Sequence, residues 1–354
     1  MHPFLRGSFF SLVAATVVTA APRSLWHVSA GPSFLLNAEV RYGANPAADP
    51  ALTPKTDRIY SDGFNRVDAS GNLGDAPGGP LASRTGYFGF TRDSQVDLRA
   101  GTLALHQAQA AGEDYVPAAR PSARPGLELA VRRSLARPDA TRDWGLELGL
   151  VFNQVKQNSN GTADANLRLL TDTYALGGVV PQRAPYTGRF TPLPGDQRIG
   201  DTPTRALGTT AGTIGGSRSL DADVTIVRFG PWLSLMPDGA AGLPHERDRW
   251  SLHARTGLGL LAVKASFRTA EQIQAPGLGL ASTVNAGADR SRTDLCSFVG
   301  LRARRAFNSR WSAVVSGDLL YGSKLTVADT ARYARLDTSR SYLVGFGIEY
   351  SGGR

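Results

Sequence analysis

The residues from Trp26 to Tyr42 alternate between two kinds of side chain. Every even position is apolar or small, and among the odd positions only Leu35 is large and apolar. A period of two predicts a β-strand with one apolar and one polar face. An ordinary strand has about five or six residues, whereas this alternation lasts for seventeen and has aromatic residues at both ends. The pattern is typical of a barrel strand that crosses a membrane, with lipid outside and a polar lumen inside.

Seven further segments show a comparable alternation. Together with residues 26–42, the predicted strands lie near 126–136, 144–155, 220–236, 250–267, 295–306, 311–321 and 341–350. An even number of strands lets both ends of a barrel lie on one side of the membrane. The sequence therefore predicts an all-β fold, a closed antiparallel up-and-down transmembrane β-barrel of eight strands that occupies residues 21–354.

The segment 220–236 changes phase partway along. Leu220 and Ile226 share one parity, whereas Phe229 and Leu233 share the other. One extra residue in the strand would produce this change, so a β-bulge is expected near residues 226–228.

The connections between strands alternate between long and short. Residues 43–124 and 156–219 are the longest, and are expected to be extracellular loops, because short turns belong in the periplasm. Segments near 86–105 or 173–190 could instead add strands and give a barrel of ten or twelve. Four strands are expected to begin, at the inner membrane interface, with the tryptophans of an aromatic girdle: Trp26, Trp144, Trp250 and Trp311.

The first residues read as an export signal. Arg6 precedes a short apolar run, and Val18-Thr19-Ala20 fits a cleavage site, so residues 1–20 are expected to be a signal peptide cleaved near Ala20. The 40 glycines and 21 prolines favour strands and loops. The net charge of +9 comes from dispersed arginines without a basic run, which argues against nucleic acid as a partner. Arginines at the rims suit anionic lipid and lipopolysaccharide. Cys296 is the only cysteine, so no internal disulfide can form.

The segment Tyr342 to Tyr350 carries large apolar residues at every even position. It resembles the last strand of bacterial outer-membrane barrels, and the whole strand pattern is similar to the eight-stranded OmpA/OmpX type. That resemblance implies a Gram-negative outer-membrane location, and recognition of the last strand by the barrel assembly machinery. Such strands usually end on the aromatic residue, whereas four residues follow it in this chain. The resemblance covers the strands and not the long loops.

The side chains predicted to face the lumen include five acids, five arginines and one histidine. An eight-stranded barrel is barely wide enough for its own side chains, and unpaired charges there would be costly. We therefore expect a plug of ion pairs, with a narrow passive channel for small solutes as the alternative. The predicted network is Glu39, Arg41, Glu128, Arg132, Glu147, His253, Arg255, Arg302, Arg304, Asp318 and Glu349.

An enzyme of the outer membrane would need a histidine near the outer rim together with a serine or aspartate. Only His106 is expected to be extracellular, and no serine motif accompanies it. The sequence predicts no catalytic, metal-binding or cofactor-binding residues, and a lipid-modifying enzyme remains the second alternative. The leading expectation is a structural or surface-binding, adhesive role at the cell envelope. The sequence specifies neither an extracellular ligand nor an oligomeric state.

Overall fold

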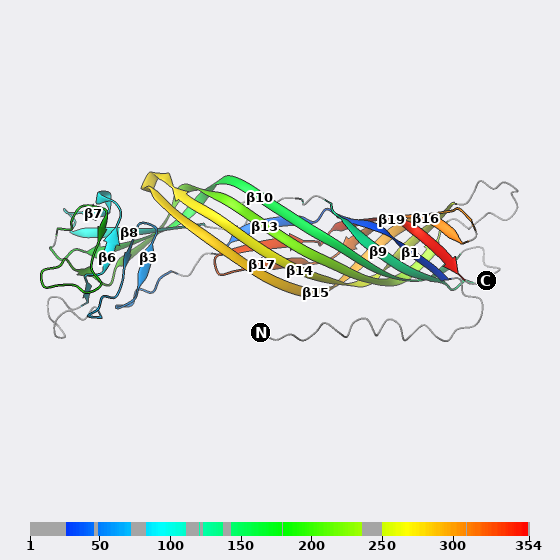
Figure 1. The fold of residues 1–354 in the computed structure, drawn as a ribbon, viewed down its shortest axis with the longest axis horizontal. Coiled ribbons are helices and arrows are strands. Elements are labelled where there is room, and N and C mark those ends of the chain that lie inside the picture. Colours follow the sequence, from blue (N-terminus) through cyan, green and yellow to red (C-terminus); the bar gives the residue numbers. More distant parts are fainter. Residues whose placement is uncertain are drawn as a thin grey trace.

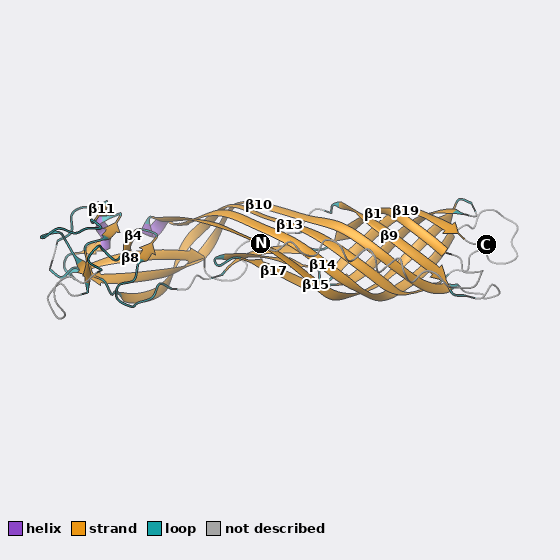
Figure 2. Cartoon of the chain, turned by 60° about the horizontal axis from the view of Figure 1, so that its bottom comes forward, coloured by secondary structure: helices purple, strands orange, loops and turns teal. Residues whose placement is uncertain are grey.

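The computed structural model describes residues 26–45, 49–71, 83–110, 120, 123–136, 143–178, 180–235, 250–308 and 310–352. The predicted signal peptide, residues 1–20, lies outside these ranges. The molecule is elongated, with a lattice of crossing strands at one end, long strands in the middle and a small cap at the other end (Figures 1 and 2). No helix among the described residues is long and apolar enough to span a membrane.

Eight strands form a closed, antiparallel ring. Each strand pairs with the next one around the ring, and the last strand closes on the first. The predicted closed ring is therefore confirmed. In order around the ring, its members are β1 (Trp26–Leu36), β9 (Pro125–Ser134), β10 (Trp144–Ala175), β13 (Thr204–Ser234), β14 (Trp250–Ala275), β15 (Leu280–Ala306), β16 (Trp311–Tyr321) and β19 (Ser341–Gly352).

Four of these strands continue far beyond the ring. β10 has 32 residues and spans roughly 100 Å at about 3.3 Å per residue, whereas about 9–11 residues cross a membrane. β10 and β13 stay paired as far as Thr173 and Thr204, and β14 and β15 form a second long hairpin. Residues 156–219 are thus not the long loop that the sequence predicted, because much of the segment is paired strand. We call the extended part of these four strands the stalk.

The inner and outer faces of the long strands exchange character along their length. In the first part of β14, which belongs to the ring and which we call its lower part, His253 and Arg255 are buried inside, and Leu258 and Leu260 are exposed outside. Further along, Leu261 and Phe267 are buried inside, and the outward positions become polar. Parity does not change, so a single unbroken strand is apolar outside at one end and apolar inside at the other.

The same exchange explains the phase change in β13, and the predicted bulge is wrong. Phe229 pairs with both Leu148 and Leu258, and the pairing with β10 continues without an extra residue on either side. Ile226 is fully buried inside, whereas Phe229 is 55 % exposed outside. Both residues follow one regular alternation of inward and outward side chains. The strand is not interrupted; instead, the apolar side chains lie outside near Phe229 and inside near Ile226.

A three-stranded sheet closes the stalk. It consists of β2 (Glu39–Ala44), β18 (Arg332–Asp337) and β17 (Lys324–Ala328). Its buried residues, among them Val40, Leu336 and Val327, share one apolar core with the inner residues of β13, β14 and β15. Side chains bridge both seams between the sheets: Tyr42 donates a hydrogen bond to the carbonyl of Gln157, and Arg290 donates one to that of Thr326. The stalk is therefore a filled sandwich.

The cap consists of short strands at the far end of the stalk (Figure 1). One sheet contains β3 (Arg58–Tyr60), β4 (Gly63–Asn65), β6 (Phe88–Phe90) and β11 (Tyr186–Thr187), and a second pairs β5 (Arg84–Thr85) with β12 (Ile199–Gly200). β8 (Thr102–Ala110) joins the edge of β10, and β7 (Val96–Asp97) joins β8. Two short 3-10 helices, η1 and η2, cover Asp93–Gln95 and Pro276–Leu278. Described residues near 86–105 and 173–190 thus belong to the cap or the end of the stalk and add no strand to the ring.

Candidate functional site

The lower part of the ring is filled by charged side chains that contact one another. Arg255 lies at the centre: its guanidinium donates to Asp318 Oδ1 and Oδ2, both at 2.7 Å, and to Glu147 Oε1 at 2.8 Å. All three residues are buried. Two donors in fixed geometry on one carboxylate make a strong, directional ion pair.

A second group gathers around Glu349, whose side chain is fully buried. Arg132, Arg302 and Arg304 approach its carboxylate to 2.6, 3.4 and 2.9 Å. Arg302 also lies 3.3 Å from Glu147, which in turn binds Arg255. The charges therefore form one connected network.

Arg228 belongs to this network but was not predicted. It is 1 % exposed, donates to Glu128 Oε1 at 2.6 Å and forms an ion pair with Asp318. The supposed bulge near residues 226–228 removed it from the set of inward residues. Continuing the alternation from Phe229 and Leu233 without a bulge would have placed Arg228 inside.

Most predicted lumen residues meet, and two do not. Glu39 and Arg41 form a separate ion pair of 2.5 Å on β2, with side chains 30 % and 44 % exposed. The prediction that they face the lumen is wrong because β1 ends at Leu36 and Asn37 has a positive φ of 59°. Because of this break, the inward and outward positions are exchanged after Asn37. The side chain of Val40 lies in the stalk core, and that of Glu39 faces outward.

His253 lies inside the ring but takes part in a different contact. Its Nε2 lies 3.1 Å from Ser251 Oγ, and its ring packs edge-on against Trp232 at 5.1 Å. The residues that the structure joins by ion pairs in the lumen are Glu128, Arg132, Glu147, Arg228, Arg255, Arg302, Arg304, Asp318 and Glu349; we call these the lumen network.

One small cavity borders the lumen network. A cavity bordered by Glu128 and Arg302 has a volume of about 10 Å³, about the smallest space that can hold one water molecule. Above the network, the apolar stalk core continues the filling. The charged side chains of the described interior are thus paired with one another, and an apolar core lies beyond them.

The four predicted girdle tryptophans begin β1, β10, β14 and β16, which run in the same direction. Trp144, Trp250 and Trp311 are each about half exposed. Arg133 and Arg305 lie over the rings of Trp26 and Trp250 at 5.3 and 5.6 Å, and Trp311 packs against Tyr350. Indole side chains with arginines beside them suit the boundary between lipid hydrocarbon and headgroups.

The cap gives His106 a partner that the sequence did not indicate. His106 Nδ1 lies 2.8 Å from Asp62 Oδ2, and Asp62 also accepts hydrogen bonds from the His106 amide and from Arg92. Asp62 thereby ties the turn after β3 to β8 and η1, since Gln95 also donates to its carbonyl. Among the described residues, no serine, threonine or cysteine side chain forms a hydrogen bond with the His106 ring. This arrangement fits a structural role.

A second cluster stabilises the base of the cap. Arg205 binds Asp172 through two nitrogens at 2.7 and 2.6 Å, and Tyr60 donates to the same carboxylate at 2.6 Å. Tyr174 packs beside Tyr60, and burial raises the pKa of Tyr174 to about 12. Burial also raises the pKa of Tyr60, so both phenols stay protonated at physiological pH and act as hydrogen-bonding groups of the core. No group of three or more His, Cys, Asp or Glu within the described ranges could hold a metal ion.

Comparisons with known proteins give structural similarity only. No family model matches the chain, and no curated protein matches it. Among solved structures, the chain is similar to the attachment invasion locus protein Ail of Yersinia pestis, solved with the heparin analogue sucrose octasulfate (10 % identity, 93 % of this chain and 99 % of that one, TM-score 0.28). It is also similar to the outer-membrane protease OmpT of Escherichia coli (8 % identity, 95 % and 99 %, TM-score 0.36). A third is a Pseudomonas aeruginosa FadL homologue (8 % identity, 93 % and 90 %, TM-score 0.20). These scores are too low to support an argument about function, which must rest on the residues of this chain.

Proposed function

We propose that this chain is a bacterial outer-membrane β-barrel of the OmpA/OmpX type, with a lumen plugged by ion pairs and a structural or surface-binding, adhesive role. The observation that carries the proposal is the concentration of outward apolar residues around the part of the closed ring that contains the lumen network. Outward side chains there include Leu129, Leu148, Phe229, Leu258, Val299, Val315 and Phe346, all at least 36 % exposed. A monomer in water rarely exposes so continuous an apolar surface.

The outward surface sets the boundaries of the proposed membrane span. Trp144 and Trp250 mark its lower edge. Its upper edge follows Phe152 on β10 and Leu260 on β14, beyond which Lys156 and Lys264 face outward. From Trp144 to Phe152 is nine residues, and about 9–11 residues cross a bilayer as a tilted strand. The partners supported by this surface are membrane lipids and lipopolysaccharide. Recognition of β19 by the assembly machinery stays a prediction.

A rigid projection supports the surface-binding role over transport. The stalk holds the cap far from the proposed membrane, and the cap has its own core, which includes Phe88, Leu105 and Tyr174. Loops of the cap expose Val180, Phe190 and Leu193. A packed stalk that presents exposed apolar residues at its tip suits contact with another surface. That the chain is not an enzyme also remains a prediction, with the rate of lipid A modification as the measurement.

Location in the membrane has a direct test. We expect the protein to fractionate with the outer membrane, and to migrate faster on a detergent gel when unheated than when boiled, because a hydrogen-bonded ring remains compact in detergent. Recovery as a soluble periplasmic protein, with identical migration before and after boiling, would contradict the proposal.

The plugged lumen predicts the absence of steady conductance. Purified protein in planar lipid bilayers should give no openings, or only rare ones, because in this proposal the lumen network and the stalk core fill a barrel that is barely wide enough for its own side chains. A porin of known conductance in the same bilayers serves as the positive control. Sustained openings from the wild-type protein would support the narrow passive channel instead.

A further inference from the structure

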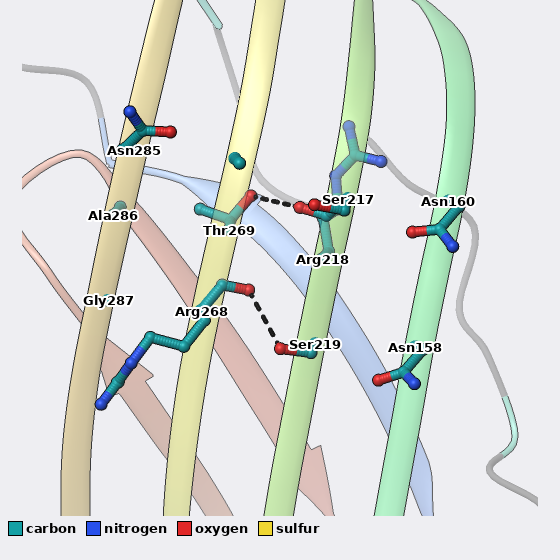
Figure 3. Close-up of a pocket in the computed structure, with 11 residues that line it drawn as sticks. Asn158, Asn160, Ser217, Arg218, Ser219, Arg268, Thr269, Asn285, Ala286 and Gly287 are labelled. Carbon is teal, nitrogen blue, oxygen red and sulfur yellow. Dashed lines mark hydrogen bonds between the residues drawn. The ribbon is translucent and has the colours of Figure 1, made fainter.

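The outer face of the stalk carries a polar groove. Hydrogen-bond register places its residues in two rows across β10, β13, β14 and β15 (Figure 3). One row is Asn158, Ser219, Arg268 and Gly287, and the next is Asn160, Ser217, Ala270 and Asn285. The space between them has a volume of about 630 Å³, which is within the usual range for a small-molecule site.

The shape of the groove follows from the sizes of these side chains. On the two middle strands, the small residues Ser217, Ser219 and Ala270 lie beside Arg268. The asparagines lie on the outer strands, Asn158 and Asn160 on β10 and Asn285 on β15 (Figure 3). Gly216 has φ +136°, and a Cβ at this position would lie 2.2 Å from the carbonyl oxygen of Ala270. A larger residue at Gly216 would therefore push β13 away from β14 at the end of the groove.

The charges at the groove are already neutralised. The Arg268 guanidinium lies 3.1 Å from both carboxylate oxygens of Asp289 and also donates to the carbonyl of Phe267. Arg218 is buried on the opposite face of the sheet, where it forms an ion pair with Glu271. A phosphate or sulfate would therefore find no uncompensated cation in the groove.

Neutral hydrogen-bonding groups remain available instead. The amides of Asn158, Asn160 and Asn285 make no side-chain hydrogen bond with the described residues, and Ser219 Oγ lies 3.5 Å from its one acceptor, the Arg268 carbonyl. An amide both donates and accepts, and so does a sugar hydroxyl. The backbone of β13 and β14 is paired on both sides at this level, so a peptide cannot bind there as an added strand.

We propose that this groove binds a neutral, hydroxyl-rich oligosaccharide. It begins six residues beyond Phe152, the last large apolar outward residue of β10, which corresponds to roughly 20 Å along the strand. At that height a saccharide could come from lipopolysaccharide of the same membrane or from another cell. The proposal uses only the geometry of the stalk, so its failure would leave the membrane assignment intact.

Binding should be measured on the full protein in detergent by isothermal titration. The probes are neutral gluco-, galacto- and manno-oligosaccharides, sulfated forms of the same sugars, and polysaccharide released by mild acid from lipopolysaccharide of the source bacterium. We expect at least one neutral probe to bind, and its sulfated form to bind more weakly. Binding of the released polysaccharide would identify the membrane's own sugar as the source, and binding of the other oligosaccharides alone would identify an external glycan.

Two alanine positions provide a matched pair of variants. Ala270→Trp would fill the groove, whereas Ala281→Trp places the same bulk on an exposed outward position of β15 outside it. Both should fold, as judged by migration of unheated protein on a detergent gel. We expect Ala270→Trp to abolish binding and Ala281→Trp to retain it. Failure of every neutral probe, preference for the sulfated sugars, or equal binding by both variants would overturn the proposal. So would a wild-type dimer that Ala270→Trp dissociates, since a second copy would then occupy the groove.

Discussion

Replacing Arg255 with alanine should destabilise the barrel by about 3–5 kcal/mol, the usual cost of removing one partner from a buried ion pair. Arg255 contacts both Asp318 and Glu147 and is 2 % exposed. Its removal would leave carboxylates in a space that cannot hydrate them. Urea-induced unfolding of the protein in lipid vesicles, followed by tryptophan fluorescence, would measure the change.

The matched control is Arg268→Ala. Arg268 also binds a carboxylate through two contacts, but its side chain and that of Asp289 are 56 % and 66 % exposed. An exposed pair contributes about 0.2–1 kcal/mol, so this variant should be nearly as stable as the wild type. Equal, small losses in both variants would mean that water reaches the lumen network, and would favour the channel.

Placing arginine at Leu258 should cost about 2–4 kcal/mol of folding free energy in a bilayer. Leu258 is 67 % exposed and lies on the outward apolar surface of β14 between Trp250 and Leu260, so the proposed membrane span would force the guanidinium into hydrocarbon. Leu148→Arg on β10 should behave similarly. The same unfolding measurement applies to both.

Gln272→Arg tests whether this loss of folding free energy is caused by burial of arginine in the membrane. Gln272 lies on the same outward face of β14, but in the stalk. Arginine there should remain hydrated and change stability by less than about 0.5 kcal/mol, as is usual for a surface substitution. A comparable loss at Gln272, or none at Leu258 and Leu148, would show that the proposed membrane span is misplaced.

The ring could be predicted from sequence because, in the proposed membrane span, lipid imposes a strict rule on its outer face. Outward positions such as Leu129, Leu148 and Val315 must be apolar, and the resulting alternation can be recognised in the sequence without a structure. The stalk follows no such rule outside. Residues 156–166 and 208–217 are rich in Gly, Ser, Thr and Asn, a composition typical of loops, yet they form a paired hairpin.

The errors in the lumen have one physical origin, the assumption that inward positions are polar along the whole strand. At Ile226 and Leu220 the interior is apolar, so their parity conflicts with that of Phe229 and Leu233 if every apolar position is assigned to one face. A bulge is then needed to place Ile226 and Phe229 on the same face, and this bulge excludes Arg228 from the predicted inward residues. The prediction for Glu39 and Arg41 is wrong for a different reason. Asn37 adopts a left-handed backbone conformation that ends β1, and although this conformation is sterically permitted for asparagine, no pattern in the sequence requires it.

The exchange of faces along β13 and β14 also determines how deeply the protein can sit in a bilayer. If the barrel moved outward, Leu258 and Phe229 would enter water; if it moved inward, Lys264 and Asp223 would enter hydrocarbon. Both displacements are costly, and each acts on several strands at once. In the proposed membrane position, the height of the cap above the lipid surface is therefore set by this exchange of faces, and lengthening or shortening the paired stalk hairpins would change that height in proportion.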